Sequence, residues 1–278
     1  TFTATWKEDA NGDGEPDDTE TKYSINYAAG TAGTNAQNMP QNEADILSGT
    51  TQTISAAVPT WTGHVFTGWT STDVTETAGN FTMPEKDVTF TAAWKVDANG
   101  NGEPDENEQK YSISYSDGEA KGAAQGMPAK AENILSGTTQ TISAAVPTWT
   151  GYVFTGWTST DVTETAGSFT MPEENVTFTA TWKEDANGDG EPDDTETKYS
   201  ITYSDGEAKG AAQGMPAKAE NILSGTTQTI STAVPTWTGY VFAGWTSNEV
   251  QATSGSFIML EANVTFTATW KEDANGDG

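Results

Sequence analysis

Hydrophobic and polar residues alternate over short stretches of this chain. In 111–115 (YSISY) two tyrosines and an isoleucine alternate with serines, and in 176–182 (VTFTATW) four apolar residues alternate with threonines. Successive side chains of a strand point to opposite faces, so this period predicts strands with one buried and one polar face. The runs TQTISAAVP and GYVFTGW predict further short strands. Only 129–137 (AKAENILSG) predicts a helical turn or short helix, ending at Gly137.

An internal repeat organises these strands. Tryptophans recur at intervals of 88 residues, at Trp6, Trp94, Trp182 and Trp270. A period of this length exceeds that of solenoid repeats and suits a small domain followed by a connector. We predict the last strand of a preceding repeat at 1–6, repeats at 23–94, 111–182 and 199–270, linker loops at 7–22, 95–110 and 183–198, and a truncated loop at 271–278.

Composition narrows the classes of function. The chain has 40 acidic and 12 basic residues and a net charge of -28. Such a surface cannot displace phosphate counterions, which argues against nucleic acid and anionic membranes as partners. No stretch approaches the roughly 20 apolar residues of a membrane span, so we expect no membrane insertion in this segment. Cysteine is absent, and any staple of the small domains must therefore use oxygen ligands.

Catalysis is not expected. The chain has one His, no Cys and no Arg, and no Ser/His/Asp arrangement recurs between the copies. His64 stands where the other copies have Tyr152 and Tyr240, which favours a half-buried ring over a ligand role. We therefore predict that the protein is not an enzyme.

The acidic linkers have the spacing of metal ligands. Residues 9–20 (DANGDGEPDDTE) fit D-x-[DN]-x-[DN]-G-x5-E, in which alternate residues of a curved loop aim oxygens inward and a late Glu closes the shell. Hard oxygen ligands in this number suit calcium better than magnesium. The predicted ligands are Asp9, Asn11, Asp13, Glu15 (through its carbonyl), Asp17 and Glu20 in the first loop; Asp97, Asn99, Asn101, Glu103, Asp105 and Glu108 in the second; Asp185, Asn187, Asp189, Glu191, Asp193 and Glu196 in the third; and Asp273, Asn275 and Asp277 in the truncated fourth.

The loops are not expected to be equivalent. Asn101 replaces an acid found in the other copies, so the second loop should bind calcium less tightly. The truncated fourth loop should be weak or empty. Strand residues rather than helices flank every loop, so these are not EF-hands. The alternative to a metal loop is a disordered acidic linker, which the composition alone allows.

Two resemblances add to this interpretation. The run GYVFTGW with FTMPEENVTFTATW, after YSISY, resembles the internalin-type B-repeat, or Listeria/Bacteroides repeat, over 23–94, 111–182 and 199–270. Members are modules of bacterial cell surfaces, and the resemblance implies an extracellular protein of mainly β (α+β) class, with tandem small β-grasp-like (ubiquitin-like) domains in an elongated rod. The DGEPD segment resembles thrombospondin type 3 repeats, which implies that calcium is a structural part of the connector.

Three functions follow as hypotheses. The first is a stalk or spacer of a bacterial adhesin or surface fibre, whose joints are flexible without metal and rigid with calcium. The second is a module that binds a host or cell-surface glycan or protein through Trp61, Trp149 and Trp237, which stand in a Pro-Thr-Trp segment where the family usually has a polar residue. The third is a fibre or matrix subunit in which chains associate by strand exchange.

Overall fold

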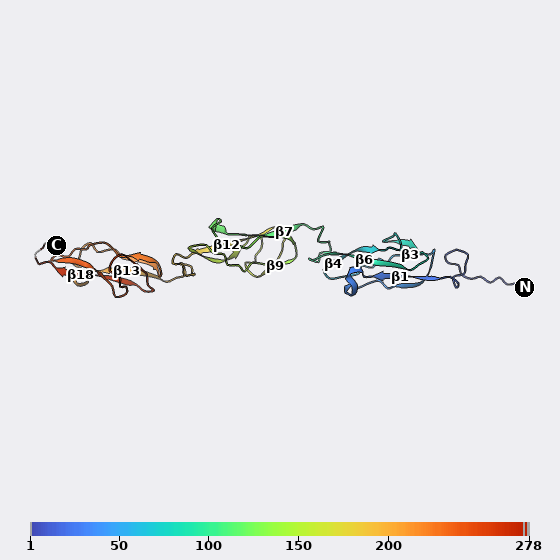
Figure 1. Ribbon diagram of the computed structural model, residues 1–278, viewed down its shortest axis with the longest axis horizontal. Helices are drawn as coiled ribbons and strands as arrows, with labels where there is room; N and C mark the ends of the chain where they lie inside the picture. Colours follow the sequence, from blue (N-terminus) through green and yellow to red (C-terminus); the bar gives the residue numbers. More distant parts are fainter. Residues whose placement is uncertain (1, 275, 277–278) are drawn as a thin grey trace. The chain divides into compact units, whose positions relative to one another are not determined.

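The computed structural model describes residues 2–274 and 276, and their regular structure is almost entirely β. Residues up to Ser112 pack as one compact unit together with 131–140 and 170–175, and the remaining residues pack as a second unit. One succession of strands occurs three times along the chain (Figure 1). The predicted class, mainly β with tandem repeats, is confirmed. Within the described part of the chain, no helix is long and apolar enough to cross a membrane.

Each repeat has six strands at equivalent positions. Those of the first are β1 (Lys22–Ala28), β2 (Glu43–Leu47), β3 (Thr51–Thr53), β4 (His64–Thr70), β5 (Asn80–Thr82) and β6 (Val88–Val96). Those of the second are β7 (Lys110–Ser116), β8 (Ala131–Leu135), β9 (Thr139–Thr141), β10 (Tyr152–Thr158), β11 (Ser168–Thr170) and β12 (Val176–Glu184). Those of the third are β13 (Lys198–Ser204), β14 (Ala219–Leu223), β15 (Thr227–Thr229), β16 (Tyr240–Thr246), β17 (Ser256–Ile258) and β18 (Val264–Glu272).

The strands of each repeat form one four-stranded and one two-stranded sheet. In the first repeat the larger sheet has the order β2-β1-β6-β4, and β3 pairs with β5. The central strands β1 and β6 are parallel, whereas both outer pairs are antiparallel. The orders β10-β12-β7-β8 and β14-β13-β18-β16 repeat this arrangement. Parallel first and last strands at the centre of a mixed sheet are the arrangement of a β-grasp sheet.

The last strand supplies the centre of the core. In β6, Val88 and Phe90 are 0% exposed and Ala92 is 4% exposed, whereas the residues between them are more accessible. Ile25 of β1 and Trp69 of β4 belong to the same buried cluster. Equivalent residues of β12 and β18 are buried to the same extent. The alternation read from the sequence therefore marks the buried face correctly.

Buried aromatic rings fix a segment that has no strand pairing of its own. The Tyr27 hydroxyl accepts a hydrogen bond from the Ser55 amide (2.8 Å), and Trp69 Nε1 donates to the Ser55 carbonyl (3.0 Å). The same two contacts hold Ser143 and Ser231 in the other repeats. Since a buried polar group is costly without a partner, these bonds also satisfy the polar ends of the core aromatics.

The helix predicted over 129–137 is wrong. Ala131–Leu135 is strand β8 at the edge of the sheet, with Asn133 in a left-handed conformation (φ 60°). Backbone pairing with β7 overrides the helical propensity of the Ala and Glu residues there. The helical elements among the described residues are short 3-10 turns, η1 (Gly30–Asn35), η2 (Gly118–Ala120) and η3 (Gly206–Ala208).

These turns lie against the last strand of the repeat at a glycine. A Cβ on Gly118, which has φ 58°, would lie 2.6 Å from the Ala180 carbonyl oxygen. Gly30 and Gly206 approach the equivalent carbonyls as closely. Only glycine combines this positive φ with so close a backbone approach.

The segment predicted to end a preceding repeat lies outside the strands. Residues 2–8 form no regular element, and Phe2 and Trp6 are exposed. Their assignment to an earlier repeat stays a prediction.

One carboxylate ties the turn after β4 to β6. Asp73 Oδ2 accepts a hydrogen bond from the Thr89 amide (2.9 Å), and its Oδ1 pairs with Lys86 Nζ (3.0 Å). The amide and then the ammonium group hold the pKa of Asp73 below its ordinary value. Asp161 and Glu249 bond to the equivalent amides in the other repeats.

Because the folded pKa of Asp73 lies below the unfolded value, its stabilisation is present above that unfolded value and is lost as the pH falls through the folded pKa. We expect Asp73→Asn to lower the free energy of unfolding by about 1 kcal/mol at neutral pH and by much less in acid, where the native carboxyl is itself protonated. Urea unfolding at both pH values measures this, with exposed Glu85→Gln as the control. An equal cost at both pH values would contradict the assignment.

Candidate metal-binding loops

Backbone amides surround the first Asp of each loop. Asp97 is 6% exposed, and its Oδ1 accepts a hydrogen bond from Gly100 N (2.8 Å) while its Oδ2 accepts one from Gly102 N (3.0 Å). The first and third loops repeat this arrangement around Asp9 and Asp185. A carboxylate needs such donors when it leaves water, so the same bonds stabilise its charge and fix the turn of the loop.

Backbone and side-chain hydrogen bonds attach the loops to the repeats. The Asp97 amide donates to the Gly63 carbonyl (3.0 Å), just before β4, and Asn99 Nδ2 donates to the Ser136 carbonyl (3.0 Å), just after β8. The third loop has the same two bonds, from Asp185 to Gly151 (2.9 Å) and from Asn187 to Ser224 (3.1 Å). Each of these loops is thus bonded to the repeat before it and to the repeat after it.

Oxygen atoms gather around the amide of the third loop position. Asn11 Nδ2 donates to Glu20 Oε1 (2.9 Å), Asp13 Oδ2 (3.2 Å) and the Ser48 carbonyl (3.1 Å). Its Oδ1 faces the other way and accepts from the Asp13 amide (3.2 Å). Three oxygens from separate parts of the chain therefore surround one group that carries partial positive charge.

The late Glu of each of the three complete loops has a buried carboxylate oxygen without a hydrogen-bond partner. Glu20 Oε1 is bonded to Asn11, but its Oε2 is buried without a hydrogen-bond partner among the described residues. The same holds for Oε2 of Glu108 and Glu196. Buried polar atoms without a partner are rare because they are costly, and their recurrence at one position in three loops calls for a ligand.

The pKa values of several loop carboxyl groups are shifted by burial and by neighbouring groups. Burial raises the pKa of Glu20 above its usual value, and the charges of Asp13 and Asp17 raise it further. The Glu15 amide lowers the pKa of Asp13. In the third loop, the pKa of Asp189 is likewise lowered by the Glu191 amide. Ionised Asp13 therefore opposes the ionisation of Glu20, an effect that a bound cation would relieve.

The other predicted ligands lie nearby in the loops. Oδ1 of Asp17, Asp105 and Asp193 accepts from the amide of Ala10, Ala98 and Ala186, each at 2.8 Å. The exposed Glu15, Glu103 and Glu191 donate their amides to the side chains of Asp13, Asn101 and Asp189. Asp273 accepts from Gly276 N (2.8 Å), whereas Asn275 and Asp277 lie outside the described residues. Within the described residues, no three His, Cys, Asp or Glu side chains are grouped as a metal site.

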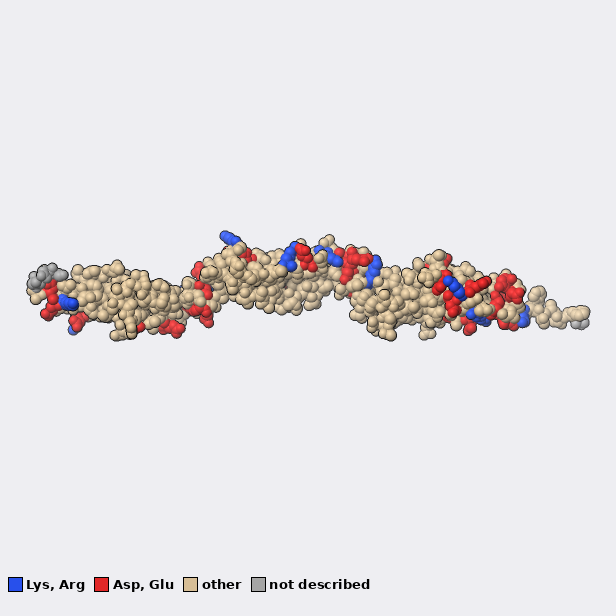
Figure 2. Space-filling model, viewed as in Figure 1, with Lys and Arg blue, Asp and Glu red and all other residues tan. Residues whose placement is uncertain are grey.

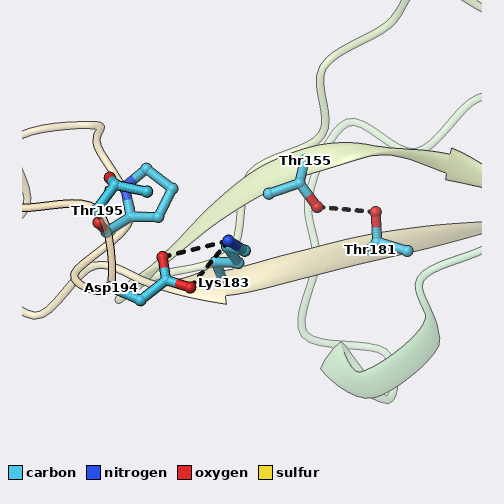
Figure 3. A network of polar contacts seen from close by, with 6 residues as sticks. Thr155, Thr181, Lys183, Asp194 and Thr195 are labelled. Atoms are coloured by element: carbon cyan, nitrogen blue, oxygen red, sulfur yellow. Dashed lines mark hydrogen bonds and ion pairs between the residues drawn. The ribbon is translucent and has the colours of Figure 1, made fainter.

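A lysine at the start of each loop pairs with an acid that is not among the predicted ligands. Lys183 Nζ contacts both carboxylate oxygens of Asp194 (2.9 and 3.2 Å), while nearby Thr155 donates to Thr181 (2.8 Å) (Figure 3). Lys7 pairs with Asp18 and Lys95 with Glu106 in the same way. These exposed pairs contribute little stability, but they place one acid of each loop on its outer side.

Charged side chains are unevenly spread over the surface. On the face drawn in Figure 2, Asp and Glu side chains gather in patches that are separated by wide uncharged areas. Lys side chains lie beside several of these patches, but the chain as a whole has 40 acidic and only 12 basic residues. Such a surface attracts cations.

The Pro-Thr-Trp tryptophans pack within their own repeats. Trp61 is half-buried, and its ring stacks on His64 at a centroid distance of 3.4 Å and an interplanar angle of 2°. The Trp61 and Trp94 rings pack edge to face, with their centroids 5.7 Å apart. Trp149 and Trp237 stack in the same manner on Tyr152 and Tyr240. His64 is a half-buried ring, as predicted, and each stack occupies one face of its tryptophan.

The carbonyls of Ser48, Ser136 and Ser224 were not predicted from the sequence, although they accept from the loop Asn side chains. A serine carries no sign of what its backbone oxygen contacts. The signal that could have drawn attention to them is the conserved 37-residue separation from the loop Asn in all three copies.

Comparisons with known proteins identify the family of the repeated unit. The family model described as "Divergent InlB B-repeat domain" matches residues 23–98, 111–186 and 199–274. Each match ends one residue after the first Asp of the following loop. Among solved structures, the chain is similar to "Streptococcal High Identity Repeats in Tandem (SHIRT) domains 3-4 from cell surface protein", with 16% identity, a TM-score of 0.28, and coverage of 60% of this chain and 99% of that chain. No curated protein matches the chain.

We expect Trp149→Ala to lower the free energy of unfolding by about 2 kcal/mol, because it removes the stack on Tyr152 and the edge contact with Trp182. Thermal unfolding measures the change, with the exposed neighbour Thr148→Ala as the control. A Trp149→Ala variant as stable as the native chain would show that the ring is available for another partner.

Proposed function

Because the chain belongs to the divergent InlB B-repeat family, we propose that it is a spacer segment of a bacterial cell-surface protein and that calcium stiffens the joints between its repeats. The observation that carries the calcium proposal is the buried, unpartnered Oε2 of Glu20, Glu108 and Glu196. These three atoms lie at the loop position where a bidentate Glu completes a calcium shell. The surface location is supported by the resemblance to bacterial surface repeats.

Each complete loop offers a full set of oxygen donors. In the first loop, Asp13 Oδ2, Glu20 Oε1 and the Ser48 carbonyl already lie around the Asn11 amide. A half-turn of that amide would bring Asn11 Oδ1 to these oxygens in place of the nitrogen. Glu20, whose Oε1 is one of these oxygens and whose Oε2 has no hydrogen-bond partner, would supply a bidentate ligand. Oxygen donors from carboxylates, an amide and a backbone carbonyl are the ligands that calcium prefers.

With the Ser carbonyl as a ligand, a bound cation would link the loop to the repeat that follows it. Asn99 contacts the Ser136 carbonyl, which follows the edge strand β8, and Asp97 is bonded through its amide to Gly63 of the preceding repeat. Calcium would neutralise the loop carboxylates and replace their repulsion by shared coordination. Ordering the loop would thereby restrict the motion of the repeats that it joins. Calcium-binding extracellular modules have dissociation constants of about 10⁻⁴–10⁻³ M. We expect the loops to bind calcium in the same range.

Ligand binding by the tryptophans is the second candidate. An open hollow of about 350 Å³ lies beside Trp61, lined also by Val58, His64 and Asp97. Val58 and its equivalents Val146 and Val234 are exposed apolar residues. We rank this function below the spacer because each tryptophan already stacks on a ring of its own repeat.

Isothermal titration calorimetry should count three calcium ions per chain, one for each complete loop. Glu108→Gln should reduce the number to two, because the second loop loses its bidentate ligand. Glu106→Gln, which removes one charge from the same loop at the acid paired with Lys95, should leave three. If both variants bound the same reduced number of calcium ions, binding would depend on the net charge of the loop and not on Glu108 as a ligand.

Small-angle scattering of the chain in calcium and in excess chelator tests the mechanical role. We expect a longer maximum dimension and less flexibility in calcium, and an intermediate result for Glu108→Gln. Calcium binding with unchanged scattering curves would separate the two parts of the proposal, leaving a metal site that does not stiffen the joints.

A further inference from the structure

The loops contain the sequence most prone to spontaneous damage of the peptide chain. The second loop reads Asn99-Gly100-Asn101-Gly102, two consecutive Asn-Gly pairs. A glycine after Asn leaves its backbone nitrogen free of steric hindrance, so that this nitrogen can attack the Asn side-chain carbonyl. The first and third loops contain one Asn-Gly and one Asp-Gly pair at the same positions.

Both attacking nitrogens of the second loop are engaged by one carboxylate. Gly100 N donates to Asp97 Oδ1 (2.8 Å) and Gly102 N donates to Asp97 Oδ2 (3.0 Å). Asp97 is 6% exposed, so little water competes for these bonds. A carboxylate that accepts an N–H also disfavours the loss of its proton, and the deprotonated nitrogen is the form that attacks.

The side chains under attack are held as well. Asn99 Nδ2 donates to Glu108 Oε1 (2.9 Å) and to the Ser136 carbonyl. Asn101 Oδ1 accepts from the Glu103 amide (2.8 Å). Cyclisation at Asn99 therefore requires that the bonds of Gly100 N and of Asn99 Nδ2 break.

We propose that Asn99 and Asn101 are deamidation sites whose reaction is suppressed by Asp97. In the reaction, the Gly nitrogen bonds to the Asn Cγ, the Cγ–Nδ2 bond breaks, and ammonia leaves with the amide proton, which closes a succinimide. Water then opens the ring at either carbonyl and yields Asp or isoaspartate. No reactant other than water is needed.

The two products have opposite consequences for the loop. Conversion of Asn101 to Asp introduces the acid that the other loops have as Asp13 and Asp189. Isoaspartate instead lengthens the backbone by one methylene and destroys the ligand spacing. The second loop has two such Asn-Gly sites, whereas the first and third loops have one each. The protection by Asp97 consists of hydrogen bonds within the loop and does not rest on calcium.

The test uses the whole chain in excess chelator at mildly alkaline pH, so that no cation contributes. Trypsin releases residues 96–110 as a peptide of unique sequence, in which mass spectrometry with fragmentation follows Asn99, Asn101 and Asn107 separately. Asn107 precedes Glu108 rather than a glycine and serves as the internal standard. The variants are Asp97→Ala and, as the matched control, Asp105→Ala, whose carboxylate accepts from Ala98 N rather than from a glycine.

We expect Asp97→Ala to accelerate deamidation at Asn99 and Asn101 about tenfold, since a hydrogen bond to a charged group accounts for at least that factor. The rate at Asn107 should not change, and Asp105→Ala should change the rates at Asn99 and Asn101 by less than about twofold. Unchanged rates in Asp97→Ala would overturn the proposal. Equal acceleration by both variants would also overturn it, because general loop order rather than Asp97 would then be protective.

Discussion

The parallel pairing of the first and last strands is the constraint on which each repeat depends. In the first repeat, β1 and β6 lie side by side and run in the same direction, with Ile25 opposite Val88 and Tyr27 opposite Phe90. Parallel strands cannot be joined by a tight turn, so the intervening segments must cross over and cover one face of the sheet. The chain also enters the repeat at one end of the sheet and leaves it at the other. A connector between two repeats must therefore begin where one sheet ends and finish where the next begins.

The contacts of the acidic loops with the repeats include hydrogen bonds from Asp97 and Asn99. The Asp97 amide is hydrogen-bonded to the Gly63 carbonyl, and its side chain accepts from the amides of Gly100 and Gly102. This one residue therefore fixes the direction in which the chain leaves the repeat and also the turn of the loop. Asn99 then contacts the Ser136 carbonyl. Such a joint depends on charge and hydrogen bonding, which respond to ions far more than apolar contacts do. The largest buried apolar side chains, such as Phe90 and Phe178, lie in the cores of the repeats.

This division places stability and chemical lability in different parts of the chain. Val88 and Phe90 are fully buried, and the core aromatics have partners for their polar atoms. The loops instead combine glycine, asparagine and aspartate, the residues that permit sharp turns with inward-facing oxygens. The same composition makes the Asn-Gly bonds reactive. In the second loop, one buried carboxylate, that of Asp97, bonds to the amides that shape the turn and to the nitrogens of both Asn-Gly bonds.

The sequence by itself determined the 88-residue period, the mainly β class and the buried faces of the central strands. These depend on local alternation, as in Val176, Phe178 and Ala180, and on exact recurrence at 88 residues. It also shows the regular spacing of Asp, Asn and Glu from which calcium ligands are predicted. It did not determine that 131–135 is a strand, because an edge strand obtains its hydrogen bonds from a partner distant in sequence.

Two features of the candidate sites were likewise decided only by the tertiary structure. The Ser136 carbonyl lies beside Asn99 because the fold brings the turn after β8 to the loop, and any residue type offers the same backbone oxygen. From the sequence alone, Trp149 could be an exposed residue that binds a ligand. In the fold, a backbone bridge pairs Trp149 with Tyr152, and the two rings stack. Local pattern specifies which residues can form a strand or hold an ion. Which distant groups meet them depends on how the strands pair, and that pairing is a property of the whole repeat.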